Sequence, residues 1–513
     1  MGTDKRAMYL KARAFRAVIV FVLFLSIFLF SKNTLAAPDK PYFTDLGQLN
    51  YAKFMMNEGE YSVAAREFSR VIESFPGSPF LPEAQFGLSE AYFNAGLYAE
   101  AERELRLFLL NFSETPFSGT AKARLEEVRE RIIEELPVIP LPEVKEAEAA
   151  RNLRAVQVML FEGKTISEVQ MELKALKSSG VDTIILRVFH NKGDRFYPFV
   201  SSKEKRGVYF NSSQSPVVGD ILDDVIRAAH DSGLSVFAWM TTRYADYGIE
   251  DNTDIACKAY DIAARSYTRC RGLDMFNDKA VERLEEIYSD LAEYEIDGIL
   301  FQDDLVLRHN EGFGPYMNGL FKKETGIDIS PESLYIRTEG TRQVHYTELF
   351  WNWASWKNKR LLDVAGRLKN AVHRKRPEAK FALNLMYETV TNPSSALAWL
   401  SQDLNEAKRR GFDYYSIMAY HRQMGEELNR EPEEIKNIIA RMVTDAAGSV
   451  GEPGKVLIKL QTIDWRTGQA LANDEVAEML RNVRSKGGVS LALVPYRGGL
   501  PLSELGGDPA LSN

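Results

Sequence analysis

Eight apolar, strand-like runs alternate with amphipathic helical patterns in the larger, C-terminal part of this chain. The runs begin near Ala155, Asp182, Leu234, Asp297, Lys380, Phe412, Lys455 and Val489. The helical patterns lie between them, for example at residues 221–232, 280–294, 356–373 and 475–485. Because eight strands that alternate with helices can close into a parallel ring, the pattern predicts an α/β fold with a (β/α)8 barrel, the TIM barrel. A doubly wound open sheet is the alternative, although no glycine-rich phosphate loop follows the first run.

The chain before this barrel is expected to contain three further segments. Basic residues precede an apolar run at residues 17–30, and small residues follow it, which is the layout of a signal peptide or membrane anchor over residues 1–37. The run is shorter than the roughly 20 residues of a spanning helix. We therefore expect an exported, periplasmic protein, either released or anchored to the inner membrane by the apolar run. A proline-containing linker is expected at residues 136–152, and the barrel at residues 153–505.

Residues 45–135 contain an internal repeat with a displacement of 37 residues. The apolar positions have helical spacing, and the pattern resembles tetratricopeptide repeats, so we expect a small all-α domain closed by a helix near residues 119–135. One hypothesis makes these repeats a spacer; the other makes them a docking surface for a protein partner. The recurring residues are Gly59, Tyr61, Ala64, Glu67, Phe75 and Pro79, which return as Gly96, Tyr98, Ala101, Glu104, Phe112 and Pro116.

Charge and cysteine content restrict the partners and the compartment. The formal net charge is -8 and no basic stripe is interleaved with aromatics, so nucleic acid is not an expected partner. The two cysteines, Cys257 and Cys270, are close in sequence and are expected to form a disulfide in an oxidising compartment; two unrelated thiols are the alternative. No cofactor is expected. A metal site is not predicted either, because the histidines lack short ligand spacing.

Two adjacent carboxylates, Asp303 and Asp304, follow the apolar strand that begins at Asp297. Removing a carboxylate from water is costly unless a hydrogen bond, a cation or a ligand compensates for it. In (β/α)8 enzymes the chemistry lies at the C-terminal ends of the strands. Since adjacent strand residues point to opposite sides, we expect one carboxylate to face a pocket and the other to brace it.

The other strand ends supply aromatic, amide and charged side chains, which is the composition of a sugar-binding groove. Each also has a structural alternative: Trp239 packs, the histidines belong to the scaffold, Asp464 caps a helix, and Glu388 lies on a solvated loop. His190 and Asn191 also fall at a strand end. The predicted substrate-binding residues are Trp239, Arg243, Gln302, His309, Asn384, Tyr420, His421, Gln461, Asp464, Trp465 and Tyr496.

Several motifs resemble a known family in the same order along the chain. They are Phe237–Met240, Asp297–Phe301 with the two aspartates, Asn384, Asn392-Pro393, Trp399, Ser416–Ala419, and Leu460-Gln461 with Trp465. With these the segment resembles the C-terminal glycoside-hydrolase domain of poly-β-1,6-N-acetyl-D-glucosamine N-deacetylases (PgaB type). The resemblance implies a periplasmic barrel that binds and cleaves partly deacetylated poly-N-acetylglucosamine, a biofilm exopolysaccharide.

The sequence departs from that family at two positions of the motif. Gln302 stands where the family usually has His, and a later family Asp falls at His309; Glu311 is a candidate replacement for it. The repeats take the place of the family's deacetylase domain, so deacetylation is not predicted. Because transport proteins of this polysaccharide system carry similar repeats, a partner in the secretion apparatus is expected.

A more distant resemblance links the strand at Asp297 and the segment Met418–Tyr420 to family-18 chitinases, which implies substrate-assisted cleavage of a 2-acetamido sugar. We therefore predict an endo-acting glycoside hydrolase in which Asp304, or else Asp303, is the general acid. Two alternatives stand beside it. One is a non-catalytic polysaccharide-binding scaffold for export, and the other is a chitinase-like or peptidoglycan-directed hydrolase.

Overall fold

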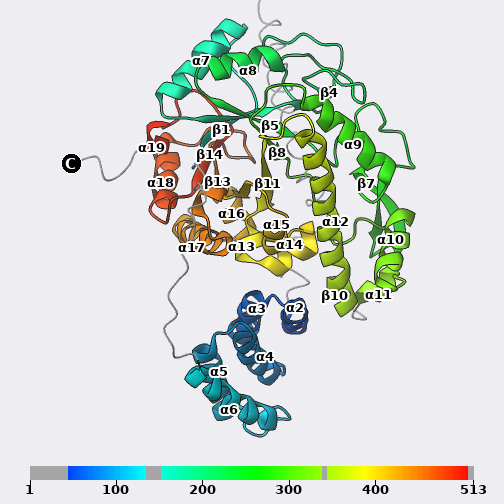
Figure 1. The fold of residues 1–513 in the computed structure, drawn as a ribbon, viewed down its shortest axis with the longest axis vertical. Coiled ribbons are helices and arrows are strands. Elements are labelled where there is room, and N and C mark those ends of the chain that lie inside the picture. The colour runs from blue at the N-terminus through cyan, green and yellow to red at the C-terminus, as the bar shows by residue number, and fades with distance from the viewer. Residues whose placement is uncertain (1–43, 135–151, 338–343, 507–513) are drawn as a thin grey trace, which may run out of the picture. The chain divides into compact units, whose positions relative to one another are not determined.

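The computed structural model describes residues 44–134, 152–337 and 344–506 (Figure 1). The predicted signal or anchor at residues 1–37 and nearly all of the predicted linker lie outside these ranges. Among the described residues, no helix combines the length and the apolar character needed to cross a membrane.

Eight parallel strands close into a barrel and follow one another around the ring in chain order (Figure 1). Each predicted strand-like run contains one of them, so the predicted (β/α)8 barrel is confirmed. The strands are β1 (Arg154–Val158), β2 (Thr183–Arg187), β5 (Ser235–Met240), β8 (Gly298–Phe301), β11 (Lys380–Met386), β12 (Tyr414–Met418), β13 (Val456–Gln461) and β14 (Ser490–Val494).

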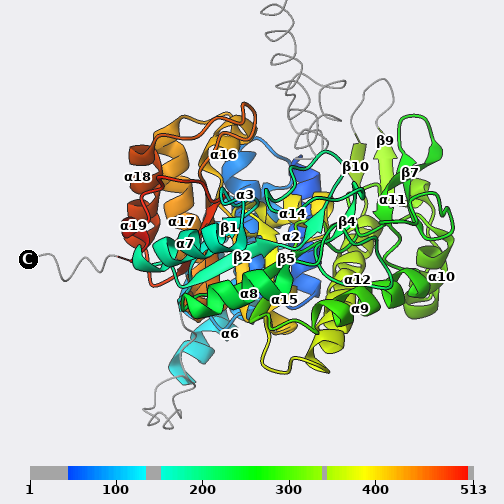
Figure 2. The same ribbon diagram turned by 90° about the horizontal axis from the view of Figure 1, so that it is seen from above.

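Helices lie around this ring (Figure 1), and the view from above places α7 (Ile166–Ser178) and α8 (Leu222–Asp231) beside β1 and β5 (Figure 2). In α8, for example, Leu222, Val225 and Ile226 are buried at helical spacing, which turns one face toward the sheet. Helix α12 begins earlier than the predicted residue 356, because Phe350 and Trp353 continue its buried face. The longer helices are α7 (Ile166–Ser178), α8 (Leu222–Asp231), α9 (Asp278–Leu291), α10 (Pro315–Thr325), α12 (Glu348–His373), α17 (Pro432–Val450) and α18 (Asn473–Arg484). The shorter ones are α11 (Pro331–Leu334), α13 (Glu388–Thr391), α14 (Pro393–Leu400), α15 (Leu404–Arg409), α16 (His421–Leu428), α19 (Ser503–Gly506) and the 3-10 helix η1 (Pro453–Lys455).

A glycine at the start of β8 permits close packing inside the barrel. A Cβ added to Gly298 would lie 2.6 Å from the ring of Phe237 and 2.7 Å from the carbonyl oxygen of Lys380. The Phe237 ring also meets Tyr414 edge-on, with 5.9 Å between the ring centroids. Only glycine therefore fits at the first residue of the strand that leads to the two aspartates.

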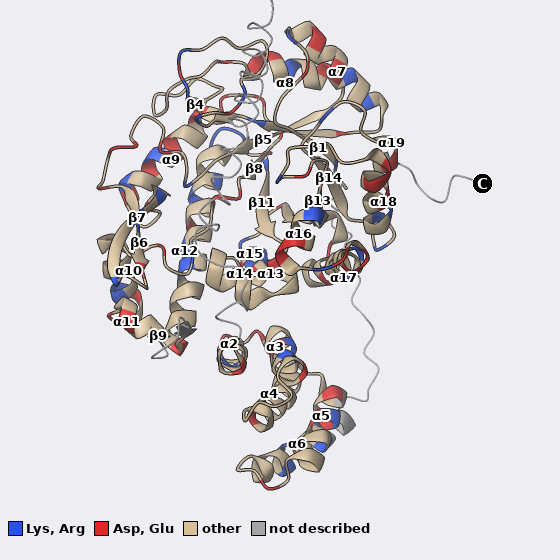
Figure 3. Cartoon of the chain, turned by 180° about the vertical axis from the view of Figure 1, so that it is seen from behind, with Lys and Arg blue, Asp and Glu red and all other residues tan. Residues whose placement is uncertain are grey.

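In the described part of the chain, three two-stranded sheets lie within the βα loops, and none of them was predicted. They are β3 (Phe189–His190) with β4 (Gly207–Val208), β6 (Ala256–Asp261) with β7 (Ser266–Leu273), and β9 (Tyr335–Arg337) with β10 (Val344–Tyr346). Cys257 and Cys270 form the expected disulfide across the β6–β7 hairpin. Charged residues of both signs are interspersed along the helices (Figure 3).

By its internal contacts the chain divides into two units. One is the barrel, and the other contains the N-terminal helices and residues 321–356. The predicted boundaries had placed residues 321–356 in the barrel. The N-terminal helices are α2 (Asp45–Asn57), α3 (Tyr61–Ser74), α4 (Leu81–Asn94), α5 (Tyr98–Asn111) and α6 (Ser118–Glu134).

The 37-residue repeat in the sequence is also a repeat of structure. Helix α5 begins and ends 37 residues after α3, and the glycines that precede them, Gly59 and Gly96, have φ angles of 77° and 75°. Gln48 donates a buried hydrogen bond to Glu67, and Gln85 donates the equivalent bond to Glu104. The predicted helical repeats are therefore present, while their membership of the tetratricopeptide family stays a prediction.

Candidate active site

Asp304 is anchored to the loop that follows β5. It is 1% exposed, and its two oxygens accept hydrogen bonds from the Thr241 hydroxyl (2.5 Å), the Thr242 hydroxyl (2.6 Å) and the backbone N–H groups of Thr242 (3.0 Å) and Tyr244 (2.8 Å). Both oxygens are occupied, so neither is free for a substrate. Asp304 thus has the geometry of the bracing carboxylate of the pair.

Asp303 is the partly exposed member of the pair. Loss of water around its carboxyl group raises its pKa, and the neighbouring charge of Asp304 acts in the same direction. Lys459 and Arg271 oppose this shift but do not cancel it. A carboxyl group that keeps its proton to a higher pH than an ordinary aspartate is better suited to general acid catalysis.

A hydrogen-bonded group joins three neighbouring strands beside Asp303. Lys459 of β13 donates to the side-chain oxygen of Asn384 on β11 (3.2 Å), and the Ser416 hydroxyl of β12 donates to the same oxygen (2.9 Å). All three residues are buried. Asn384 was a predicted substrate-binding residue, whereas Lys459 was missed. A lysine inside an otherwise apolar strand, Val456–Gln461, was the signal that could have identified it.

Tyr420 and Trp465, both predicted to line the groove, lie together at the ends of β12 and β13. Their ring centroids are 5.5 Å apart, and both residues are partly exposed. Burial, followed by the charge of Asp303, raises the pKa of Tyr420 well above its ordinary value, which places the ring near that carboxyl group. An aromatic pair beside an acid suits the apolar face of a sugar ring.

Within the described ranges, the buried polar atoms at or near strand ends that have no hydrogen-bond partner include Trp239 Nε1, Gln302 Oε1 and Gln157 Oε1. Trp239 also packs edge-on against Phe189, with 5.0 Å between centroids. Because buried polar groups are nearly always paired, atoms of this kind are candidates for contact with a bound ligand or water. Gln157 was not predicted; like Lys459, it is a polar residue within an apolar strand.

Arg243 forms a scaffold ion pair. It is 1% exposed and its guanidinium lies 2.7 Å from Glu311, which also accepts the backbone N–H of Arg308. Burial alone would raise the pKa of Glu311, but Arg243 beside it holds that pKa below its ordinary value. Glu311 is therefore a poor replacement for the family's missing acid.

The three histidines at the predicted site lie in separate scaffold contacts. His309 packs against Trp399 with 4.3 Å between ring centroids, and burial lowers its pKa to about 3. His421 Nε2 lies 2.8 Å from Glu475, and His190 Nδ1 lies 2.7 Å from the hydroxyl of Tyr209. Within the described ranges, no group of three or more His, Cys, Asp or Glu side chains could hold a metal ion.

The remaining predicted residues bond to the backbone or to scaffold side chains. The Gln461 side chain accepts from the backbone N–H of Arg422 (2.9 Å) at the start of α16, and Asp464 accepts from the backbone N–H groups of two residues in its own turn. Burial and then Glu172 raise the pKa of Tyr496 to about 12. Asp464 therefore holds its own turn and does not cap a helix, because α18 begins at Asn473 with Ala472 as its N-cap. The part that these three residues play in substrate binding stays a prediction.

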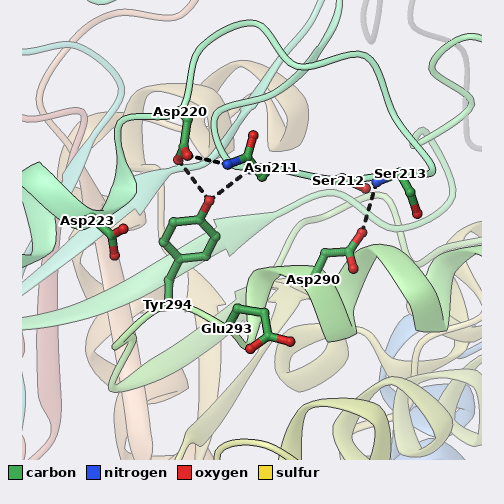
Figure 4. A pocket seen from close by; sticks show the side chains of 8 residues that line it. All are labelled: Asn211, Ser212, Ser213, Asp220, Asp223, Asp290, Glu293 and Tyr294. Carbon is green, nitrogen blue, oxygen red and sulfur yellow. Dashed lines mark hydrogen bonds between the residues drawn. The ribbon is translucent and has the colours of Figure 1, made fainter.

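An acidic recess of about 550 Å³ lies elsewhere, at the C-terminal end of α9 (Figure 4). Asp220 accepts hydrogen bonds there from Asn211 (2.5 Å) and from the hydroxyl of Tyr294 (2.8 Å), and Asp290 accepts from the backbone of Ser213. Tyr294 precedes β8 and Asp303 follows it, so the two residues lie at opposite ends of this strand. The recess is therefore not part of the candidate active site.

Comparison with known proteins identifies the class of this barrel. The glycoside hydrolase domain of PgaB (BpsB) from Bordetella bronchiseptica has the same fold, with a TM-score of 0.53, 20% identity, and coverage of 67% of this chain and 94% of that chain. The barrel thus shares the fold of that domain, and its class follows from a family match. Residues 167–493 match hypothetical glycosyl hydrolase family 13, and the chain belongs to that family.

Two other solved structures are less similar. The catalytic domain of a β-amylase from Paenibacillus polymyxa has a TM-score of 0.44 and 12% identity, over 68% of this chain and 93% of that chain. A β-galactosidase from Rahnella sp. R3 has a TM-score of 0.46 and 11% identity, over 68% of this chain and 51% of that chain. No curated protein matches the sequence.

Proposed function

We propose that this protein is an exported glycoside hydrolase that cleaves partly deacetylated poly-β-1,6-N-acetylglucosamine, with Asp303 as the general acid. The observation that carries the proposal is the pair at the end of β8: a partly exposed Asp303 with a raised pKa, next to an Asp304 that accepts four donors. Two neighbouring carboxyl groups in such different surroundings are suited to different roles.

The chemistry follows from this division of roles. Asp303 donates its proton to the glycosidic oxygen, the bond between that oxygen and the anomeric carbon breaks, and both bonding electrons stay on the oxygen. Water adds at the anomeric carbon, and the proton that it releases restores the acid. Asp304 fixes the loop after β5 throughout the cycle. This assigns the acid to Asp303, the second of the two choices that the sequence offered.

The choice of an aminosugar polymer rests on two kinds of support. The motifs from Phe237 to Trp465 resemble the PgaB-type domain, and a solved domain with this fold is the glycoside hydrolase domain of PgaB (BpsB). The Tyr420–Trp465 pair supplies an aromatic surface for the sugar rings beside the acid.

The test is cleavage of purified, partly deacetylated poly-β-1,6-N-acetylglucosamine by the full exported chain, followed by the size distribution of the products. We expect shorter chains with the wild type and at least a 100-fold loss with Asp303→Asn, since a general acid contributes about 10²- to 10⁴-fold. Asp445→Asn, on the exposed face of α17, is the matched control and should cleave normally.

Other results lead to other functions. Retention of the polymer without shortening identifies a non-catalytic export scaffold, and cleavage of β-1,4-linked substrates alone identifies a chitinase-like or peptidoglycan-directed enzyme. Full activity of Asp303→Asn would contradict the assigned acid.

Export and a partner for the repeats belong to the same proposal. The Cys257–Cys270 disulfide supports an oxidising compartment outside the cytoplasm. The stacked helices α2–α6 form a unit of a kind that commonly binds other proteins, and a component of an exopolysaccharide secretion apparatus is the proposed partner. Cell fractionation under oxidising conditions tests the first point, and affinity capture with residues 45–134 present or deleted tests the second.

A further inference from the structure

A lysine in the wall of the barrel has surroundings that packing alone does not explain. Lys459 lies within β13, where it pairs in register with Met418 of β12 and Ala492 of β14, and it is 2% exposed. Burial of an ammonium group is costly unless it is paired and hydrogen-bonded. An apolar residue at this position would avoid that cost, so the charge requires another reason.

The hydrogen bonds of Lys459 leave part of its capacity unused. An ammonium group has three donor hydrogens. Within the described parts of the chain, its one hydrogen-bond acceptor is the side-chain oxygen of Asn384, 3.2 Å away, and that oxygen also accepts from Ser416. Asn384 therefore fixes the position of the ammonium group without neutralising its charge.

The opposite charge near Lys459 is Asp303. Each affects the other: the ammonium group lowers the pKa of Asp303 against burial, and Asp303 raises the pKa of Lys459 against burial, which leaves the latter at about 8. The other groups that act on Asp303 are the carboxylate of Asp304 and the guanidinium of Arg271, whose carbon lies 4.0 Å from the centroid of the Tyr244 ring. The charge of Asp303 also raises the pKa of Tyr420, after the larger effect of burial.

We propose that Lys459, held by Asn384, is a positioning residue that stabilises the carboxylate left on Asp303 after the proton has moved to the glycosidic oxygen. This inference rests on the proposed function. The ammonium group does not touch the reacting bond. The ammonium group acts through Asp303. When Asp303 gives its proton to the glycosidic oxygen, its carboxyl group is left with a negative charge, and Lys459 stabilises that charge. A fixed positive charge in a buried place is effective there, since water does not screen it.

The test is the pH dependence of kcat/KM for Lys459→Met, Lys459→Gln and Lys459→Arg in the full chain. In the wild type the activity falls at high pH as Asp303 loses its proton. Removal of the positive charge raises the pKa of Asp303, so the high-pH fall in the Met and Gln variants should move up by about one pH unit or more. Their kcat at neutral pH should drop about tenfold or more, because the anion is less stabilised. The Arg variant keeps the charge and should stay near the wild-type profile.

The matched control is Lys357→Met. Lys357 is also fully buried, but its ammonium group donates to the carbonyl oxygen of Arg308 (2.8 Å) and it is affected by Glu311 and Arg243 instead of Asp303. Its removal should leave the high-pH fall where it is. The Gln variant covers the case in which Lys459→Met fails to fold, because it retains a polar group beside Asn384.

The outcomes separate this inference from the proposed function. If the wild type shortens the polymer and Asp303→Asn does not, the function holds; an unchanged high-pH fall in the Lys459 variants then overturns the role of Lys459 alone. If the wild type shortens no polymer, the proposed function fails first. A shift of equal size in Lys357→Met would show that loss of any buried ammonium group is enough, and would also overturn the inference.

Discussion

Replacement of Asp304 by asparagine should destabilise the barrel. Thr242 N lies 3.0 Å from both oxygens of the carboxylate, so the new amide nitrogen lies beside a backbone donor in either orientation. One buried N–H group left without an acceptor costs about 1–3 kcal/mol, and the remaining bonds lose the extra strength that a charged acceptor provides. We expect the free energy of unfolding to fall by about 2–4 kcal/mol.

The assay combines thermal unfolding of the full chain with hydrogen exchange of the segment from Thr241 to Tyr244. In Asp304→Asn both the midpoint and the protection of these amides should decrease, whereas Asp303→Asn, next to it in sequence, should retain both. If Asp304→Asn instead keeps wild-type stability and amide protection but abolishes cleavage, Asp304 is not a brace, and the division of roles between the two aspartates is refuted.

Three further predictions follow from the surroundings of individual side chains. Because burial raises the pKa of Asp303 in the folded chain, the contribution of this carboxyl group to stability is present at acid pH and is lost as the pH rises through the folded-state pKa. Asp303→Asn should remove this loss, so the variant should unfold at the same or a higher temperature than the wild type at pH 7. A variant less stable than the wild type at pH 7 would contradict this prediction. Reduction of Cys257–Cys270, which closes a loop with a sequence separation of 13, should lower the free energy of unfolding by about 3 kcal/mol, measured by thermal unfolding with and without reductant; equal midpoints would count against it. Arg243→Met leaves Glu311 buried without its partner and should cost about 3–5 kcal/mol, and the double variant with Glu311→Gln should recover part of that loss in denaturant unfolding.

The sequence pattern was sufficient for the barrel because its physical cause is local. In strands and in helices the apolar residues recur with different periods, so the alternation of the two is visible in the sequence. All eight predicted runs contain a strand of the ring. The β6–β7 hairpin was missed since the part of β7 before Cys270 is exposed and polar, so it lacks the apolar alternation of a half-buried strand. The start of α12 was missed although Phe350 and Trp353 already have the spacing of a buried helix face.

The position of the candidate site was predictable from the sequence, but the roles of its residues were predictable only in part. Its position at the end of β8 follows from topology. The expected division into a facing and a bracing aspartate was based on strand geometry, although both residues lie in the turn after β8. Which of the two is the brace depends on the donors of Thr241 and Thr242, from a different loop, and no pattern near Asp304 reveals them. Arg243 was expected to face the substrate for a similar reason: its partner Glu311 lies 68 residues away.

The regular step in the N-terminal helices has a consequence for engineering. Helix α6 begins at Ser118, 37 residues after the start of α4 at Leu81, so it stands where the first helix of another pair belongs. A copy of residues 81–117 inserted before Ser118 should therefore add one more helical hairpin with its own buried glutamine–glutamate bond. The number of inserted copies would then determine the number of stacked helices in this unit.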